Sequence, residues 1–213
     1  MIGSTAKTLL KNRLGRGTSA NTAFDTWMQS ELEAAQTRLE KMSVLPYFLV
    51  SERAFSVVTI NEERVQLPTG FLREVEETVV QLYDTSSGEY EELVKNLPED
   101  LKIHHPDEET GRPKRYAIRG DYFLVCPIPD KTTYQIWMTY YKAADVITDE
   151  AENAWLQYYP DLLIAEAGVL MASTLRNDAA LNSLSTLKNQ QMEALLRDEN
   201  ARLQANLDPT PED

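Results

Sequence analysis

The sequence predicts an α+β protein, in which a helical bundle of about four helices carries an antiparallel β-rich extension. Near both ends of the chain, in residues 24–42 and 179–206, apolar residues recur at spacings of three and four. This spacing is typical of amphipathic helices, and the second segment predicts a long C-terminal helix. The middle of the chain instead has short runs rich in aromatic and β-branched residues, which favour strands.

The point at which one pattern gives way to the other predicts the domain boundaries. Pro46 follows the first long helical segment, and the helical pattern returns after Ala143 and Ala144. The predicted parts are a helical bundle from residues 1–46 and 144–206, a β-rich insertion at 47–143 with a polar loop at 84–114, and an acidic C-terminal tail at 207–213.

The N-terminal part predicts two helices. Residues 5–15 carry apolar side chains on one side, which predicts a short helix. A glycine-containing break follows at residues 15–19. Asn21 or Thr22 is a suitable N-cap for the longer helix that follows, because a short polar side chain accepts from the first free backbone N–H groups.

The strongest strand signal is a hairpin followed by a third strand. Residues 115–119 and 122–127 flank a Gly-Asp turn, and residues 133–141 follow after a second turn. The third strand is apolar on both faces, with Trp137 and Tyr141 on one of them. This pattern predicts a central strand covered twice or a strand that packs on a partner, so both residues are candidate subunit contacts. Residues 71–83 favour a strand as well.

Residues 84–114 are more polar and contain three prolines. Ser86 and Glu89 have the spacing of a capping box, which predicts a short helix over residues 88–97. The remainder is predicted to be an extended loop, and a loop of this length usually has a task or is mobile. We expect it to face a neighbouring subunit or another protein.

The C-terminal part predicts three helical segments. Asp149 and Glu152 are spaced to cap the first, and Pro160 restarts the helix. Residues 162–175 are apolar nearly all round, which predicts a helix buried on most sides. The long last helix follows at residues 179–206.

Charge excludes some functions. The formal net charge is −13, although residues 1–20 carry four basic and no acidic side chains. So acidic a chain repels nucleic acid phosphates over most of its surface. The four basic residues are predicted to dock on an acidic face of a neighbouring copy, with a nucleic-acid-binding module as the alternative. They are Lys7, Lys11, Arg13 and Arg16.

Cysteine and hydropathy patterns favour a protein made in an intracellular, reducing compartment. The one cysteine, Cys126, lies in an apolar segment, where a buried structural thiol is expected, and it has no internal disulfide partner. The sequence contains no run of 18 apolar residues, so it predicts no membrane span. The N-terminal segment lacks the apolar core of a secretory signal.

The sequence shows no set of catalytic residues. His104 and His105 are the only histidines, and with the neighbouring acidic residues 107–109 they would form at most a weak metal site. A hydrolase that uses these histidines stays open as an alternative of another class. No phosphate-binding loop occurs. We therefore expect no enzyme activity, no cofactor, and no catalytic or metal residues.

Taken in order, several motifs resemble the head-to-tail adaptor (connector, or neck) proteins of tailed bacteriophages. The resemblance covers roughly residues 5–176, and its motifs are turns and packing positions. They are Arg13-Leu14-Gly15-Arg16, Pro46-Tyr47-Phe48-Leu49, Leu67-Pro68-Thr69-Gly70-Phe71, Arg115-Tyr116-Ala117-Ile118-Arg119-Gly120-Asp121, Pro127-Ile128-Pro129-Asp130, Met138-Thr139-Tyr140-Tyr141, Asn153-Ala154-Trp155-Leu156 and Tyr159-Pro160-Asp161-Leu162-Leu163.

The resemblance implies a structural protein in the neck of the virion. Such adaptors form a homo-oligomeric ring, usually of about twelve copies, closed by head-to-tail contacts. The ring docks on the portal protein, contacts tail proteins (tube, nozzle or fibre), and lets genomic DNA pass through its lumen without specific binding. A neck stopper or tail-completion protein is the runner-up. No membrane is implied.

The last helix and tail are the predicted portal-docking arm. An exposed helix followed by a proline-containing tail suits a segment that becomes ordered on binding. The predicted docking residues are Leu195, Leu196, Leu203, Leu207 and Pro209.

Overall fold

The computed structural model describes residues 1–17, 21–76, 78–104 and 110–207. The chain divides into two compact units, of which one combines residues 1–49 with 144–213 and the other comprises residues 50–143. The first is helical and the second is built mainly of strands, so the protein is α+β as predicted. We refer to them as the helical unit and the β unit, and each is described by itself.

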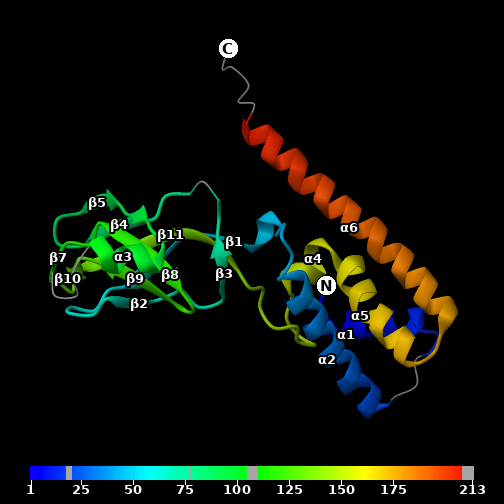
Figure 1. The fold of residues 1–213 in the computed structure, drawn as a ribbon. Helices are drawn as coiled ribbons and strands as arrows, with labels where there is room; N and C mark the ends of the chain where they lie inside the picture. Colours follow the sequence, from blue (N-terminus) through cyan, green and yellow to red (C-terminus); the bar gives the residue numbers. More distant parts are fainter. Residues whose placement is uncertain (18–20, 77, 105–109, 208–213) are drawn as a thin grey trace. The chain divides into compact units, whose positions relative to one another are not determined.

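The helical unit is arranged around α5, which contacts α1, α2, α4 and α6 (Figure 1). Nine of its fifteen residues are buried, as the all-round apolar pattern predicts. Gly168 lets the neighbouring helices approach, because an added Cβ would lie 2.9 Å from Leu184 of α6 and 3.0 Å from Leu10 of α1. The elements of the unit are α1 (Gly3–Arg13), α2 (Thr22–Leu39), η1 (Tyr47–Leu49), α4 (Ala154–Tyr158), α5 (Pro160–Thr174) and α6 (Asp178–Leu207).

Two helix starts illustrate the local signals. The Asn21 side chain accepts from the Phe24 N–H at 3.1 Å, as predicted. The predicted cap of α4 by Asp149 is wrong, because Asn153 accepts from the backbone N–H groups of the next two residues. The Asp149 carboxylate instead pairs with Lys7.

The β unit contains a larger and a smaller sheet. The five-stranded sheet runs β1-β11-β4-β5, with β3 also paired to β11, and all its pairs are antiparallel. Its strands are β1 (Val50–Val57), β3 (Phe71–Glu74), β4 (Gln81–Asp84), β5 (Glu89–Glu92) and β11 (Tyr134–Lys142). The predicted strand over 71–83 is therefore two strands with a break between them.

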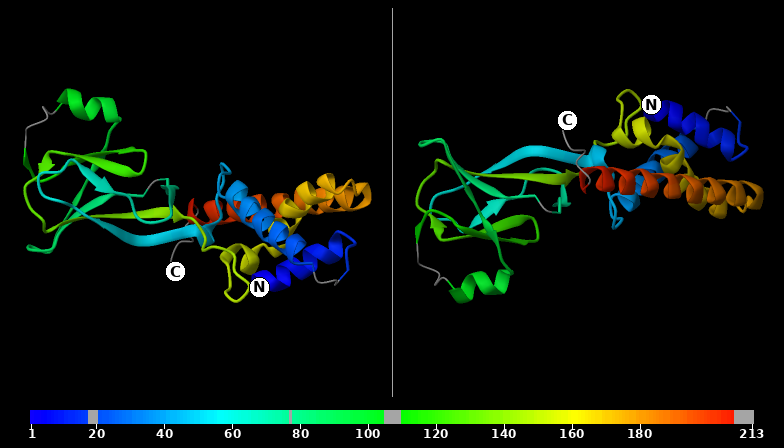
Figure 2. Two further views of the ribbon diagram at one scale, coloured as in Figure 1. Left: turned by 90° about the horizontal axis from the view of Figure 1, so that it is seen from below. Right: turned by 90° about the horizontal axis from the view of Figure 1, so that it is seen from above.

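The four-stranded sheet runs β2-β9-β8-β6 and contains the predicted hairpin. A separate parallel pair joins β7 to β10. The elements are β2 (Arg64–Gln66), β6 (Val94–Lys95), α3 (Pro98–His104), β7 (Thr110–Gly111), β8 (Arg115–Arg119), β9 (Tyr122–Cys126) and β10 (Ile128–Pro129). In Figure 2, α3 lies on one side of the unit and the long strands β1 and β11 lie on the other.

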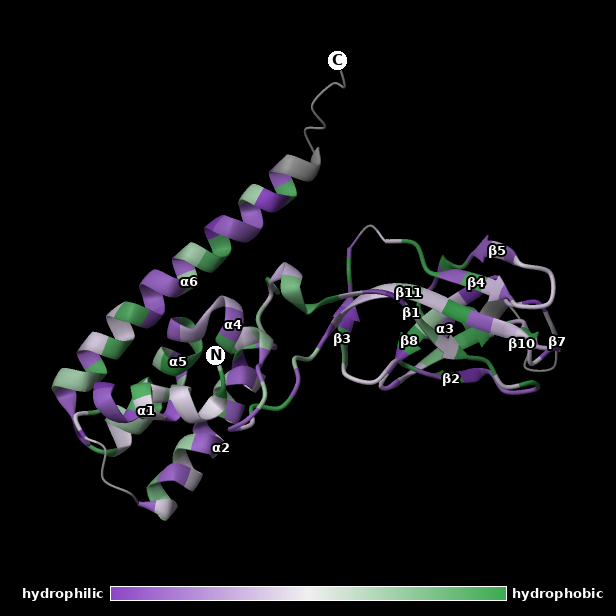
Figure 3. Ribbon diagram, turned by 180° about the vertical axis from the view of Figure 1, so that it is seen from behind, coloured by the Kyte–Doolittle hydropathy of each residue, from purple (hydrophilic) through white to green (hydrophobic). Residues whose placement is uncertain are grey.

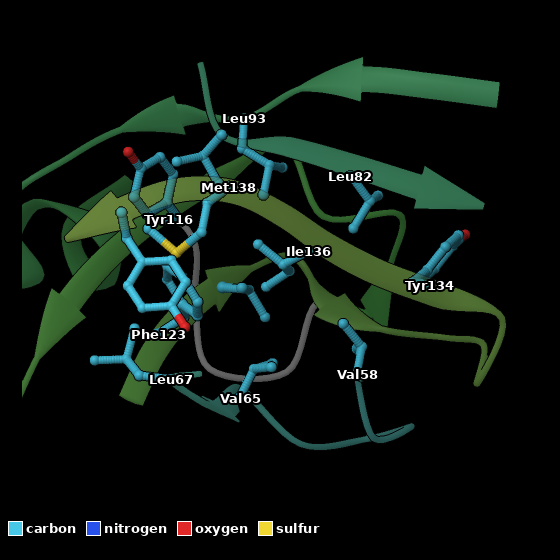
Figure 4. Close-up of a cluster of buried hydrophobic side chains, with 13 residues drawn as sticks. Val58, Val65, Leu67, Leu82, Leu93, Tyr116, Phe123, Tyr134, Ile136 and Met138 are labelled. Carbon is cyan, nitrogen blue, oxygen red and sulfur yellow. The ribbon is translucent and has the colours of Figure 1, made fainter. Parts of the chain in front are cut away.

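The core of the β unit lies between the inner faces of these two sheets. Ile136 and Met138 of β11 point toward Phe123 of β9 and Val65 of β2 (Figure 4). Alternation along the strands explains this arrangement, since every second side chain of β11 is buried.

The helix predicted over residues 88–97 is wrong. Residues 89–92 form β5, which pairs with β4, and residues 94–95 form β6. The Ser86 hydroxyl donates to the Asp84 carboxylate at 2.6 Å, and the Ser86 N–H donates to it at 2.9 Å, so this serine completes a turn rather than capping a helix. The helix of this segment is α3, which begins at Pro98.

Candidate interaction surfaces

The most conspicuous surface of the β unit is a row of aromatic side chains on the outer face of the five-stranded sheet. Strand register brings them together, because Phe55 pairs with Trp137 and Tyr83 pairs with Tyr90. We call these four residues the aromatic stripe. It crosses β1, β11, β4 and β5 and therefore spans the sheet.

The rings of the stripe contact one another. Phe55 stacks on Trp137 with ring centroids 5.6 Å apart, and Tyr83 stacks on Tyr90 at 4.4 Å. Tyr83 also meets Trp137 edge-on at 5.7 Å. Phe55 and Tyr90 nevertheless remain 50% and 54% exposed. Large aromatic side chains held in a rigid array but open to solvent mark a protein-contact surface.

A hollow of about 410 Å³ lies beside the stripe. Its lining includes Arg53, Val79, Tyr90 and Trp137. Arg53 lies at a β-bulge in β1, with a left-handed φ of 51°. A bulge redirects a side chain, and a strained non-glycine backbone often accompanies a functional position. Within the described part of the chain, Arg53 forms no ion pair.

The sequence identified one member of this surface. Trp137 belongs to the stripe, while Tyr141 lies further along β11, with the Arg73 guanidinium 5.2 Å from its ring centroid. Their role as subunit contacts stays a prediction. Phe55, Tyr83 and Tyr90 were missed because they lie on separate strands, and only the register places them beside Trp137.

A second exposed surface lies on α6, where hydrophobic and hydrophilic residues alternate along the helix (Figure 3). Leu195 is fully buried within the helical unit, which corrects its prediction as a docking residue. Leu196 and Leu203 are 37% and 59% exposed. The side chain of Leu207, and Pro209 as a whole, lie outside the described residues.

Polar contacts hold the exposed end of α6. The Tyr159 hydroxyl donates to Asp198 at 2.7 Å, and the Tyr47 backbone N–H donates to Glu199 at 3.2 Å. The Arg202 guanidinium lies 3.5 Å from the centroid of the Tyr47 ring. Burial raises the pKa of Glu199, although the Tyr47 N–H bond partly offsets this.

The first half of α6 is anchored by charge as well as by apolar packing. Glu166 of α5 accepts from Arg38 of α2 at 2.7 Å and lies 2.8 Å from the Lys188 ammonium of α6. Burial alone would raise the pKa of Glu166, but hydrogen bonds from the two cations bring it below its ordinary value. One carboxylate thus joins three helices.

Three of the four predicted basic contact residues form ion pairs inside the helical unit. Lys7, Lys11 and Arg13 lie 2.5 Å from the carboxylates of Asp149, Asp25 and Asp161 respectively. Arg16 lies above the Phe24 ring at 6.0 Å. Contact with a neighbouring copy stays a prediction for all four residues, and for three of them it would have to extend or replace an existing pair.

His104 and His105 cannot be placed in a site, for the following reason. Residues 105–109 and the His104 side chain lie outside the described part, so the weak metal site and the hydrolase alternative are not tested. Among the remaining described residues, no three His, Cys, Asp or Glu side chains gather in a way that would hold a metal ion. No described helix has the length and hydropathy needed to cross a membrane.

These surfaces define a class of protein that works through contacts with other macromolecules. Both units leave ordered apolar side chains open to solvent. The family model described as SU10 adaptor protein matches residues 2–210, so the chain belongs to this family of phage adaptors. Its role is that of a structural adaptor within the virion. No curated protein matches the chain.

Proposed function

We propose that this adaptor forms a homo-oligomeric ring, of about twelve copies, that joins the portal protein to the tail of the virion. The observation that carries the proposal is the second half of α6, which leaves Leu196 and Leu203 exposed on a helix held there by polar contacts. Apolar side chains on such a helix suit insertion into a groove of a partner.

The portal-docking surface consists of Leu196 and Leu203, extended by Leu207 and Pro209 along the chain. Leu195 is left out because it is buried. The tail proteins bind elsewhere on the ring, and the segment 84–114 is the proposed contact with them or with a neighbouring subunit.

DNA passes through the ring without specific binding. Each copy carries a formal charge of −13, and an acidic lumen repels the phosphate backbone, so DNA slides rather than binds. The role requires no reaction. Replacing both His104 and His105 with alanine is expected to leave assembly unchanged, whereas a hydrolase would lose activity.

The first experiment is to measure the molecular mass of the purified protein alone and mixed with portal rings of its phage. We expect a monomer of 24.2 kDa in solution and about twelve copies on each portal ring. If the protein does not bind portal rings, the proposal is refuted.

A truncation then locates the docking arm. A chain lacking residues 200–213 is expected to retain the fold, because residues 200–204, the last of α6 whose burial is described, are all exposed, but it is expected to lose portal binding. The matched variant is Leu196→Ser with Leu203→Ser, in which the tail remains. Unchanged binding by either variant would contradict docking through α6.

A further inference from the structure

The two sheets of the β unit differ in what covers their outer faces. On the four-stranded sheet, Leu101 of α3 packs on Ala117 of β8 and Leu124 of β9, and all three are buried. On the five-stranded sheet, the corresponding face is the aromatic stripe, and Phe55 and Tyr90 are half exposed. The unit therefore completes one outer face itself and leaves the other without a cover from its own described residues.

The edges of the five-stranded sheet are poorly suited to pairing with a strand of another chain. Its outer strands are β1, β5 and the short β3, which pairs only with β11 and ends in Arg73 and Glu74. The edge at β1 is interrupted by the bulge at Ser51–Ala54, and β5 carries three glutamates in four residues. Bulges and charged side chains on edge strands oppose pairing with another chain. The outer face of the sheet, rather than its edges, is thus the surface open to a partner.

The chain itself offers a complementary patch on the opposite side of the same unit. Leu97 is 66% exposed immediately before α3, and the first turn of α3 carries Glu99 and Asp100. This patch places an apolar side chain next to carboxylates. The stripe places aromatic rings next to Arg53, a cation that forms no ion pair within the described residues. The two patches therefore complement each other in apolar surface and in charge.

We propose that the aromatic stripe and Arg53 of one copy bind residues 97–100, at the start of α3, of the next copy. The proposal rests on the proposed ring and names the contact that closes it. Because the two patches lie on opposite outer faces of one β unit, the contact is heterologous. Repeated head-to-tail contacts of this kind form a closed ring when the rotation between copies closes.

Charge reversal tests the pairing in the full chain on portal rings. Arg53→Glu is expected to lower the occupancy of the ring by about tenfold or more at limiting protein. The double variant Glu99→Arg, Asp100→Arg is expected to do the same. Combining all three changes restores occupancy, because the charges face each other again. Arg119→Glu, at the tip of the hairpin, is the matched control and leaves occupancy unchanged.

The outcomes separate the two proposals. If the wild-type chain does not join the portal, the proposed ring fails, and this inference fails with it. If the wild type assembles and Arg53→Glu assembles equally well, only the inference is overturned. Loss without rescue in the triple variant also overturns it, because Arg53 then meets a different group.

A cross-link distinguishes a head-to-tail contact from a symmetric one. Val57→Cys lies on the outer face of β1 beside the stripe, and Leu97→Cys lies before α3; both positions are exposed. We expect a disulfide between copies only when the two variants are mixed on portal rings. A disulfide formed by Val57→Cys alone would mean that stripe meets stripe, and would refute the proposed contact.

Discussion

The two outer faces of the β unit are built from the same kind of antiparallel sheet, yet only one is completed by the chain. Over β8 and β9, α3 contributes Leu101 and excludes water from Ala117 and Leu124. Over β1, β11, β4 and β5, the rings of the aromatic stripe stack on one another, and Phe55 and Tyr90 remain half exposed. A face of this kind, rigid and apolar but uncovered, is available to another subunit.

The two halves of α6 repeat this contrast within the helical unit. Up to Leu195, the helix buries Leu184 and Leu195 itself, and Lys188 pairs with Glu166. Among the described positions after Leu195, the one buried side chain is the polar Glu199. In both units, surfaces needed for folding are therefore distinct from the apolar surfaces left open.

The largest expected effect comes from breaking the covered face. Leu101→Ala removes an almost fully buried side chain and is expected to lower the free energy of unfolding by about 2–4 kcal/mol. Urea denaturation followed by tryptophan fluorescence measures this change. Phe55→Ser, on the open face, is the matched control and should change stability by less than about 1 kcal/mol. Equal losses in both variants would contradict the comparison.

A smaller effect is expected at the junction of three helices. Glu166→Gln removes the charge that Arg38 and Lys188 share, and both cations are about one third exposed. Solvent screening limits the cost, so we expect a loss of about 1–2 kcal/mol near neutral pH. Because the pKa of Glu166 is lowered in the folded state, this stability is present above its ordinary pKa and is lost as pH falls through the folded value.

The measurement is thermal unfolding of the wild type and Glu166→Gln from pH 7 to pH 3. The difference between them should shrink as the solution is acidified. A constant difference across this range would show that the charge of Glu166 is not what joins the helices.

At Glu199 the pKa shift is in the opposite direction to that of Glu166, so its effect on stability at neutral pH is also opposite. Its pKa is raised by burial, so the folded state binds its proton more readily, and the buried charge costs stability at neutral pH. Glu199→Gln keeps an acceptor for the Tyr47 N–H and is expected to raise stability at pH 7 by up to about 1 kcal/mol. The gain should disappear as pH falls through the folded pKa. Glu193→Gln, exposed on the same helix, is the control.

A further pH-dependent effect is expected at the turn between β4 and β5. Hydrogen bonds from the Ser86 hydroxyl and N–H hold the pKa of Asp84 at about 2, against 3.8 ordinarily. Asp84 therefore contributes stability that is present above pH 4 and is lost between about pH 4 and pH 2. NMR titration of its carboxyl carbon measures the pKa directly, and Ser86→Ala should move it upward. A titration near 4 in the wild type would contradict the turn geometry.

Local patterns were sufficient to predict most of the elements. The three-and-four spacing in α2 and α6, the all-round apolar α5 and the hairpin of β8 and β9 depend on side chains close in sequence, whose period reflects the backbone geometry. The order of the turn motifs also predicted the adaptor family, which the family match confirms.

Tertiary structure decided what local patterns cannot express. Residues 89–92 became a strand because β4 lies beside them, although Ser86 and Glu89 have helix-capping spacing. The side of α6 that meets its own unit determines that Leu195 is buried and Leu196 exposed. Lys7, Lys11 and Arg13 found carboxylates within the same unit.

The sequence by itself determined the class of fold, the family and the supply of apolar and charged side chains. Which of those side chains remain open to a partner was decided by register and packing. Phe55, Tyr83 and Tyr90 join Trp137 only through antiparallel pairing across four strands. That pairing depends on contacts between residues far apart in the chain, and the periodicity of any single segment does not encode it.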